Sequence, residues 1–183
     1  MADKKAIFLD RDGTINVDKH YLYKVSDFEY LDGAIDALNT LSSMGFIMVV
    51  VTNQSGIARG YYTEEDYQIL DKWMKEDLQN KGINIAASYF CPHLPDGVVP
   101  EYSIDCDCRK PKTGLFYKAA NDLDIDLTRS YAIGDKLRDL SICKESAVKG
   151  ILLSDEDNTS YDDISVCRNW KEIVDTITTF ESK

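Results

Sequence analysis

The sequence predicts an α/β fold with a doubly wound, Rossmann-like parallel sheet. Short apolar runs rich in β-branched residues alternate along the chain with longer segments of helical periodicity. This alternation is typical of βαβ units, whose strands run parallel. A chain of 183 residues with 44% hydrophobic residues can bury one core but is too short for two domains of ordinary size. We therefore expect one domain over residues 1–183.

The local pattern indicates where each element lies. Strands are expected at the apolar runs 6–9, 46–51, 86–90, 131–133 and 151–153. Apolar residues at helical spacing before Gly45 predict a helix over residues 31–44, and Thr63 followed by three acidic residues is typical of a capped helix that ends at Gly82. Further helices are expected over residues 114–122, from about Leu137, and over 170–180. The acidic stretch 154–163 is expected to be a solvated loop.

Charge and composition restrict the function. The net charge of −11 argues against a nucleic-acid or anionic-membrane partner, so any phosphate pocket has to be locally basic. Residues 1–5 lead directly into the first strand without an apolar stretch that could serve as a signal peptide or membrane span. We expect a cytoplasmic monomer that acts on a small molecule. Five cysteines, an odd number, are unlike a disulfide framework.

Two carboxylates, Asp10 and Asp12, follow directly after the first expected strand. The carboxyl ends of the strands line the ligand crevice of an open α/β sheet, and an acid pair there can hold a divalent cation and attack phosphorus. The alternative is an EF-hand calcium loop, which needs further acidic ligands and a helix on each side. Thr14 and Asn16 follow instead, and a strand-like run precedes. The pair therefore favours phosphoryl transfer.

Three later segments carry groups suited to the same chemistry. Thr52 offers a hydroxyl and Lys110 an ammonium to phosphoryl oxygens, and Asp135 adds a carboxylate for a bridging cation. We expect them at the ends of the second, third and fourth strands. Each alone is also common in turns, surface charge runs or strand-to-helix corners. Together, in this order, they predict a site that works by positioning and charge stabilisation.

In these four motifs, Asp10-x-Asp12-Gly-Thr, Thr52, Lys110 and Gly-Asp135, the sequence resembles the haloacid dehalogenase (HAD) superfamily of phosphohydrolases. The resemblance spans residues 6–153. It implies that Asp10 is the nucleophile and forms an aspartyl-phosphate, and that Asp12 is the general acid and then the general base. Thr52 and Lys110 complete the catalytic set. Catalytic Mg²⁺ would bind Asp10, the carbonyl of Asp12 and Asp135.

Members of this superfamily often carry an inserted cap domain. The interval between Asp12 and Thr52 has room for a loop and one helix, and the interval from Asn53 to Arg109 has room for one helix, one strand and a loop. A capless, HAD-like domain with an open site is therefore expected. Short loops must then supply substrate recognition.

One of these loops contains the two chelating pairs Cys91-Pro-His93 and Cys106-Asp-Cys108. Three thiolates and one imidazole suit tetrahedral Zn²⁺. The alternative is a set of buried cysteines and a surface histidine, but residues 91–108 hold three of the five cysteines and one of the two histidines. Four protein ligands leave no open position, so this Zn²⁺ would be structural and would staple the loop. Cys143 and Cys167 are expected to be packed thiols.

The combined motifs look like those of the heptose 1,7-bisphosphate phosphatase family, which removes the 7-phosphate of D-glycero-D-manno-heptose 1,7-bisphosphate on the route to nucleotide-activated heptose for lipopolysaccharide. The resemblance places substrate contacts at Asp18, Lys19, His20, Tyr21, Thr52, Asn53, Gln54, Ser55, Arg109, Lys110 and Lys136. The histidinol-phosphate phosphatases of histidine biosynthesis share the four motifs and the zinc ligands. Their loop between the ligand pairs is typically shorter, so the spacer here favours the heptose family.

A non-enzymatic alternative is a receiver-like or zinc-dependent interaction module on the same kind of sheet. A receiver needs one phospho-accepting aspartate and no partner such as Asp12. Because Asp12 is the residue that a hydrolase needs to protonate the leaving oxygen, its presence favours the enzyme.

Overall fold

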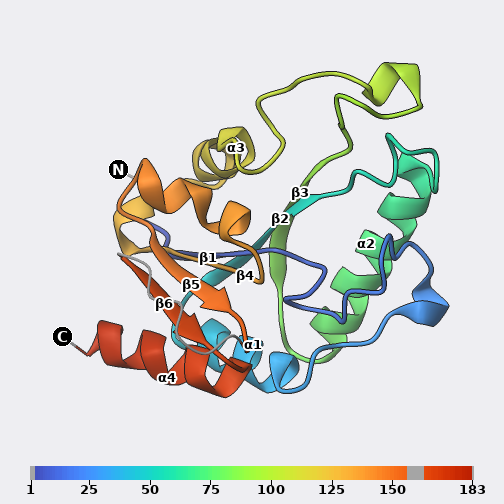
Figure 1. The fold of residues 1–183 in the computed structure, drawn as a ribbon. Coiled ribbons are helices and arrows are strands. Elements are labelled where there is room, and N and C mark those ends of the chain that lie inside the picture. Colours follow the sequence, from blue (N-terminus) through green and yellow to red (C-terminus); the bar gives the residue numbers. More distant parts are fainter. Residues whose placement is uncertain (1–2, 156–162, 183) are drawn as a thin grey trace.

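The computed structural model describes residues 3–155 and 163–182, and its centre is one parallel sheet of six strands (Figure 1). The strand order is β3-β2-β1-β4-β5-β6, so the order reverses between β1 and β4. The crevice at such a switch point is where open α/β sheets bind ligands. The strands are β1 Ala6–Leu9, β2 Ile47–Asn53, β3 Ile85–Cys91, β4 Tyr131–Gly134, β5 Lys149–Leu153 and β6 Ile164–Cys167.

Helices cover both faces of the sheet. In Figure 1, α1 and α4 lie below the sheet and α3 lies above it. A 3-10 helix, Leu137–Lys144, packs on the α3 side, where its Leu140 and Ile142 join the apolar cluster of α3. The α-helices are α1 Ala34–Ser43, α2 Glu64–Asn80, α3 Gly114–Leu123 and α4 Trp170–Glu181.

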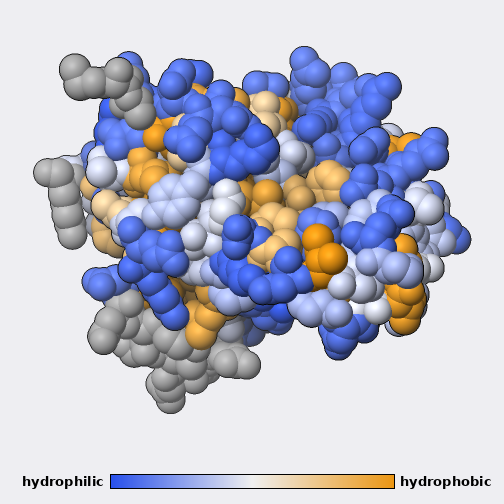
Figure 2. Space-filling model, turned by 90° about the horizontal axis from the view of Figure 1, so that it is seen from above, coloured by the Kyte–Doolittle hydropathy of each residue, from blue (hydrophilic) through white to orange (hydrophobic). Residues whose placement is uncertain are grey.

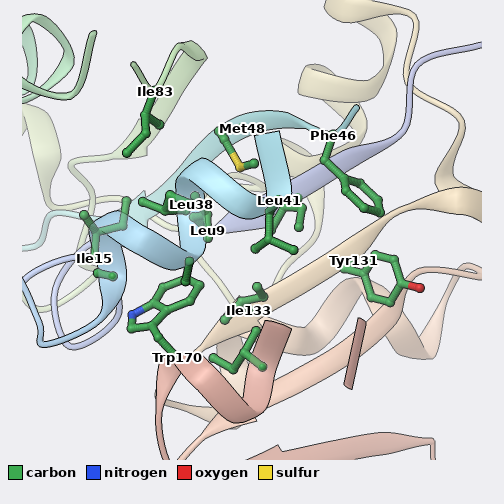
Figure 3. Close-up of a cluster of buried hydrophobic side chains, with 14 of the residues drawn as sticks. Leu9, Ile15, Leu38, Leu41, Phe46, Met48, Ile83, Tyr131, Ile133 and Trp170 are labelled. Carbon is green, nitrogen blue, oxygen red and sulfur yellow. The ribbon is translucent and has the colours of Figure 1, made fainter. Parts of the chain in front are cut away.

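The alternation of side chains along each strand divides the core into two layers. Ile7 and Leu9 of β1 enter the cluster shared with α1, α2 and α4, whereas Ala6 and Phe8 enter the cluster shared with α3. Figure 3 shows Trp170 among Ile15, Leu38 and Ile133 in the first cluster. The indole of Trp170 also donates to the carbonyl of Thr14 at 2.9 Å. The core thereby fixes the loop that follows β1.

The predicted strands are confirmed to within a few residues, and the helices lie where the pattern placed them. The helix from Leu137 is a 3-10 helix, with i to i+3 bonds such as Asp139 N–H to the carbonyl of Lys136 at 2.9 Å. Strand β6 was not predicted, because this half-buried strand at the sheet edge lacks the continuous apolar run that marks β1 and is ordered by pairing with β5. Most of the acidic stretch 154–163 lies outside the described residues.

The segments between strands carry single helices and loops, as the capless prediction requires. Within the described residues 3–155, no cap domain interrupts the sheet before or after β2. None of the helices in the described ranges is long and apolar enough to cross a membrane. The face in Figure 2 is mainly hydrophilic, with hydrophobic residues visible in patches between charged ones.

Candidate active site

Asp10 is the first residue after β1 and sits at the switch point between β1 and β4. Its backbone N–H donates to the carbonyl of Ile133 at 3.0 Å, so the chain still follows β4 at this residue. Gly13 then adopts a left-handed conformation with φ of 81°, which costs glycine little. The N–H of Gly13 donates to the carbonyl of Asn16 at 2.7 Å and closes a tight turn. This turn holds Asp10 and Asp12 at the mouth of the crevice.

The ammonium of Lys110 lies under Asp10. It is 2.9 Å from Asp10 Oδ1 and 2.7 Å from Asp139 Oδ1, and it donates to the carbonyl of Val51 at 2.7 Å. Burial opposes the charge of Lys110, but Asp10 and Asp139 outweigh burial and raise the pKa of the ammonium. Conversely, burial is the main cause that raises the pKa of Asp10, against the opposing effect of Lys110. The two carboxylates thus favour the charged form of Lys110 beside Asp10.

The position of Lys110 corrects one expectation. Strand β3 ends at Cys91, so Lys110 does not follow a strand end but comes at the end of a long loop. Asn53, at the end of β2, fixes that loop. Its amide donates to the carbonyl of Lys110 at 3.0 Å, and its Oδ1 accepts the N–H of Lys110 at 3.0 Å. Two hydrogen bonds from a neighbouring strand replace the strand that was expected to carry the lysine.

Three carboxylates form a candidate cation site at this edge. Asp10, Asp135 and Asp139 bring their oxygens within 4.8 Å of one another. A Cβ on Gly13 would lie 2.5 Å from Asp135 Oδ2, so only glycine lets the turn approach this group. Burial and the neighbouring Asp139 raise the pKa of Asp135. Crowded, half-buried carboxylate oxygens fit a hard divalent cation such as Mg²⁺. The carboxylate of Asp12 is not part of this group.

These residues open into a pocket of about 280 Å³. Of the predicted site residues, Asp10, Asp12, Asp18, His20, Tyr21, Thr52, Asn53, Gln54, Ser55, Arg109, Asp135 and Lys136 line it. Lys110 lies beneath the pocket and reaches it through Asp10. Lys19 does not line the pocket. Its ammonium lies 3.0 Å from Glu29, and the next two residues, His20 and Tyr21, have positive φ.

Sequence reasoning missed four residues that line the pocket, namely Arg59, Tyr62, Arg138 and Asp139. Arg59 and Tyr62 follow the turn after β2. Arg59 lies in the segment 52–60, which contributes to the family resemblance, but neither side chain was assigned a role. Asp139 stands four positions after Asp135. One turn of helix after the strand end would have brought it to the same side, and that spacing was the available signal.

The predicted zinc ligands converge. The Sγ atom of Cys108 lies 3.0 Å from Cys91 and 3.2 Å from Cys106, and His93 Nδ1 lies 3.3 Å from Cys108. All four ligand atoms lie within 4.8 Å of one another, and the three cysteines are free thiols. A tetrahedral Zn–S distance of about 2.3 Å gives edges of about 3.8 Å. The recorded separations between ligand atoms, from 3.0 to 3.8 Å, are at or below these edges, so the donor set converges closely enough for Zn²⁺, near the loop end that carries Arg109.

Known proteins are similar to this chain in sequence and in fold. A family model described as polynucleotide kinase 3 phosphatase matches residues 5–177. The D-glycero-beta-D-manno-heptose-1,7-bisphosphate 7-phosphatase of Yersinia pestis is 52% identical over 135 residues, which cover 74% of this chain and 72% of the relative.

Two solved structures show the same fold. A HAD-like phosphatase from Mesorhizobium loti superposes with a TM-score of 0.87 at 34% identity, covering 98% of this chain and 87% of that one. The D,D-heptose 1,7-bisphosphate phosphatase from B. bronchiseptica, complexed with magnesium and phosphate, superposes with a TM-score of 0.81 at 29% identity, covering 96% and 99%. The chain therefore belongs to the family of heptose 1,7-bisphosphate 7-phosphatases within the HAD superfamily.

Proposed function

We propose that this protein is a magnesium-dependent phosphatase that removes the 7-phosphate from D-glycero-D-manno-heptose 1,7-bisphosphate through an aspartyl-phosphate. The observation that carries the proposal is the contact between Asp10 and Lys110 beside Asp135, in a pocket lined by Asp12 and Thr52. It supplies a nucleophile, a cation for the phosphoryl oxygens and a candidate acid in one place. The family membership supports the substrate. As an enzyme, the chain is a phosphoric monoester hydrolase.

The reaction proceeds in two steps on the side chains of the pocket. A carboxylate oxygen of Asp10 attacks phosphorus, the bond from phosphorus to the sugar oxygen breaks, and Asp12 gives its proton to that oxygen. Water then attacks the phosphorus of the aspartyl-phosphate, and Asp12 takes a proton from it. Phosphate leaves and the carboxylate of Asp10 is restored. Lys110 and the hydroxyl of Thr52 stabilise the phosphoryl oxygens throughout.

Mg²⁺ is the cofactor that this site fits. Asp10 and Asp135 would hold it together with the backbone carbonyl of Asp12, and Asp139 lies within reach of the same position. When bound, the cation neutralises charge on the phosphoryl oxygens that the carboxylates would otherwise repel.

The rim of the pocket favours a substrate with a second negative group. Four cationic side chains line the pocket, from Arg59, Arg109, Lys136 and Arg138, together with five aspartates, and a bound Mg²⁺ would offset the charge of Asp10, Asp135 and Asp139. Such a local concentration of positive charge attracts an anion such as the 1-phosphate. Histidinol phosphate carries an ammonium at the corresponding end, and the rim would repel it. This electrostatic difference favours the heptose bisphosphate over the runner-up.

Zn²⁺ at Cys91, His93, Cys106 and Cys108 is proposed as a structural cofactor. Four protein ligands exclude substrate from the metal. The binding loop also supports the site directly, because Arg109 Nη1 donates to the carbonyl of His93 at 3.2 Å. The expected monomeric state and cytoplasmic location remain predictions.

Comparative hydrolysis tests the substrate. We expect release of phosphate from both anomers of heptose 1,7-bisphosphate with Mg²⁺, and kcat/KM at least about tenfold higher than for histidinol phosphate, as the loss of one anion-binding contact implies. An oligonucleotide 3′-phosphate serves as the control for the broader family. Preference for histidinol phosphate or for the oligonucleotide would overturn the substrate assignment.

A further inference from the structure

Arg11 stands between the two aspartates of the motif and is completely buried, with 0% of its surface exposed. It does not line the pocket, whereas Asp12 does. The guanidinium donates to both oxygens of the Asp12 carboxylate: Nη2 lies 2.9 Å from Oδ2 and 3.1 Å from Oδ1, and Nε lies 3.2 Å from Oδ2. Arg11 therefore contacts the proposed acid/base from behind and has no access to substrate.

The guanidinium also reaches two other parts of the pocket wall. Its Nη2 donates to the carbonyl of Leu22 at 3.0 Å, directly after the pocket-lining residue Tyr21. The same nitrogen lies 3.4 Å from Gln54 Oε1. Arg11 thus connects the acid/base to the loop before Leu22 and to the turn after β2.

A ring of further hydrogen bonds completes the support of Asp12. Gln54 Nε2 donates to Asp12 Oδ2 at 3.1 Å, and Asn16 Nδ2 donates to Oδ1 at 3.0 Å. Gln54 is itself held by the hydroxyl of Tyr62 at 2.6 Å. A Cβ on Gly56 would overlap the Tyr62 ring, so glycine leaves the room that the ring needs. Both oxygens of the carboxylate are fixed by donors.

Stability alone does not account for a cation at this place. Arg11 Nη1 is buried and has no hydrogen-bond partner among the described residues, and an unsatisfied buried donor costs free energy. A buried ion pair is often replaceable by apolar side chains without loss of stability. The geometry instead indicates that Arg11 orients the carboxylate of Asp12, because a planar guanidinium can fix a carboxylate through two parallel hydrogen bonds.

We propose that Arg11 is a positioning residue that fixes the carboxyl group of Asp12 for proton transfer and couples it to the loop ending at Leu22. The inference rests on the proposed role of Asp12 as the acid/base. Without Arg11, the carboxyl group retains Gln54 and Asn16 as donors but loses the one partner that contacts both of its oxygens. Protonation of the leaving oxygen then slows.

The test compares two leaving groups. Phenyl phosphate needs a proton on its leaving oxygen, whereas 4-nitrophenyl phosphate releases a phenolate that is stable without one. Because kcat/KM reports the steps up to formation of the phosphoenzyme, a weakened acid lowers it mainly for phenyl phosphate. General acid catalysis contributes about 10²–10⁴-fold, so we expect Arg11→Met to lower the phenyl to 4-nitrophenyl ratio of kcat/KM at least about tenfold. An unchanged ratio in a folded variant overturns the proposal.

Three variants make the outcome unambiguous. Asp12→Asn should change the ratio most. If it does not, the acid role of Asp12 fails and the inference about Arg11 falls with it. If Asp12→Asn changes the ratio and Arg11→Met does not, only the inference about Arg11 is overturned. Tyr67→Phe is the control for packing, because its ring lies under the guanidinium at 5.7 Å but its hydroxyl has no partner in the described part of the chain. If Tyr67→Phe changed the phenyl to 4-nitrophenyl ratio as much as Arg11→Met does, the proposal would be overturned. If Arg11→Met does not fold, Arg11→Lys, which keeps the charge, takes its place. Arg11→Lys should shift the ratio in the same direction. An unchanged ratio in this variant would overturn the proposal.

Discussion

The ammonium of Lys110 lies 2.7 Å from the carboxylate of Asp139, and both side chains are almost completely buried. The 3-10 helix Leu137–Lys144 supplies Asp139, whose other oxygen accepts the N–H of Lys136 at 3.0 Å. Lys110 therefore stands between two carboxylates, and Asp10 is only one of them. Asp139 therefore competes with Asp10, the proposed nucleophile, for the ammonium of Lys110.

Removing the charge of Asp139 should impair both activity and stability. In Asp139→Asn, the ammonium of Lys110 keeps only Asp10 as a charged partner and draws that carboxylate away from attack. We expect kcat to fall at least about tenfold and unfolding free energy to fall by about 1–3 kcal/mol, less than for an uncompensated buried charge. Steady-state kinetics at saturating Mg²⁺ and thermal unfolding measure the two effects. Unchanged kcat would mean that Asp139 serves the fold alone.

Asp10→Asn should abolish turnover and leave the fold intact. An amide cannot form the aspartyl-phosphate, and losses at nucleophiles are large. Single-turnover experiments with acid trapping of the phosphoenzyme give the measurement. A rate above about 1% of wild type would contradict the nucleophile role.

Purified protein should contain close to one equivalent of zinc, in addition to exchangeable magnesium. Cys106→Ser removes one of the four converging ligands and should lower the zinc content and loosen the loop that carries Arg109. Cys143→Ser is the matched control, because Cys143 lies outside that cluster. Elemental analysis of protein prepared without chelator decides, and absence of zinc in the wild type refutes the site.

Arg109 is expected to read the part of the substrate remote from the reacting phosphate. Arg109 lines the pocket whereas Lys110, its neighbour, is buried against Asp10. A guanidinium suits bidentate capture of a second phosphate, so Arg109→Ala should raise KM for heptose bisphosphate far more than for a small monoester. Lys112→Ala is the control from the same loop, since Lys112 pairs with Asp105 away from the pocket.

Equal losses on both substrates would assign Arg109 to the loop, because its contact with the carbonyl of His93 also braces the zinc ligands. Measuring the zinc content of Arg109→Ala distinguishes a role in the loop from a role in substrate binding. An intact zinc content with a selective rise in KM supports the substrate role.

Glu181 should stabilise the protein in a pH-dependent way. It accepts hydrogen bonds from Lys5 at 2.8 Å and Tyr131 at 3.0 Å and so ties the end of α4 to the sheet. Burial alone would raise the pKa of Glu181, but these partners outweigh it and leave the pKa below its ordinary value of 4.5. A lowered pKa in the folded state means that this stabilisation is complete above pH 4.5 and is lost as pH falls through the folded value.

Glu181→Gln should therefore lower the unfolding free energy at pH 7 by roughly 0.5–1 kcal/mol, which lowers Tm. At pH 3 the substitution should have little effect on Tm. Asp175→Asn on the same helix is the control, because Asp175 and its partner Lys171 are both largely exposed. A destabilisation of equal size at both pH values would show that packing, and not the charge of Glu181, matters.

Local sequence patterns were enough to predict five of the six strands and most of the chemical groups of the site. Buried strands such as Ala6–Leu9 have continuous apolar runs because helices cover both of their faces, and that pattern is local. The same holds for Asp10 and Asp12, since a residue that follows a strand must lie at the sheet edge. The two Cys and His pairs could also be recognised in the sequence, because chelation of one metal ion restricts the spacing within each pair.

The tertiary structure alone decided which groups meet across long separations in the chain. Lys110 reaches Asp10 through a loop fixed by Asn53, and no strand pattern predicts a loop path. Asp139 was passed over although its four-residue spacing from Asp135 was a local signal, and Arg11, the middle residue of a motif, has no periodic signal. Both side chains are buried beside opposite charges. At low solvent exposure the strength of such an interaction depends strongly on the partner and on the distance to it. These contacts depend on the packed core and cannot be read from neighbouring residues.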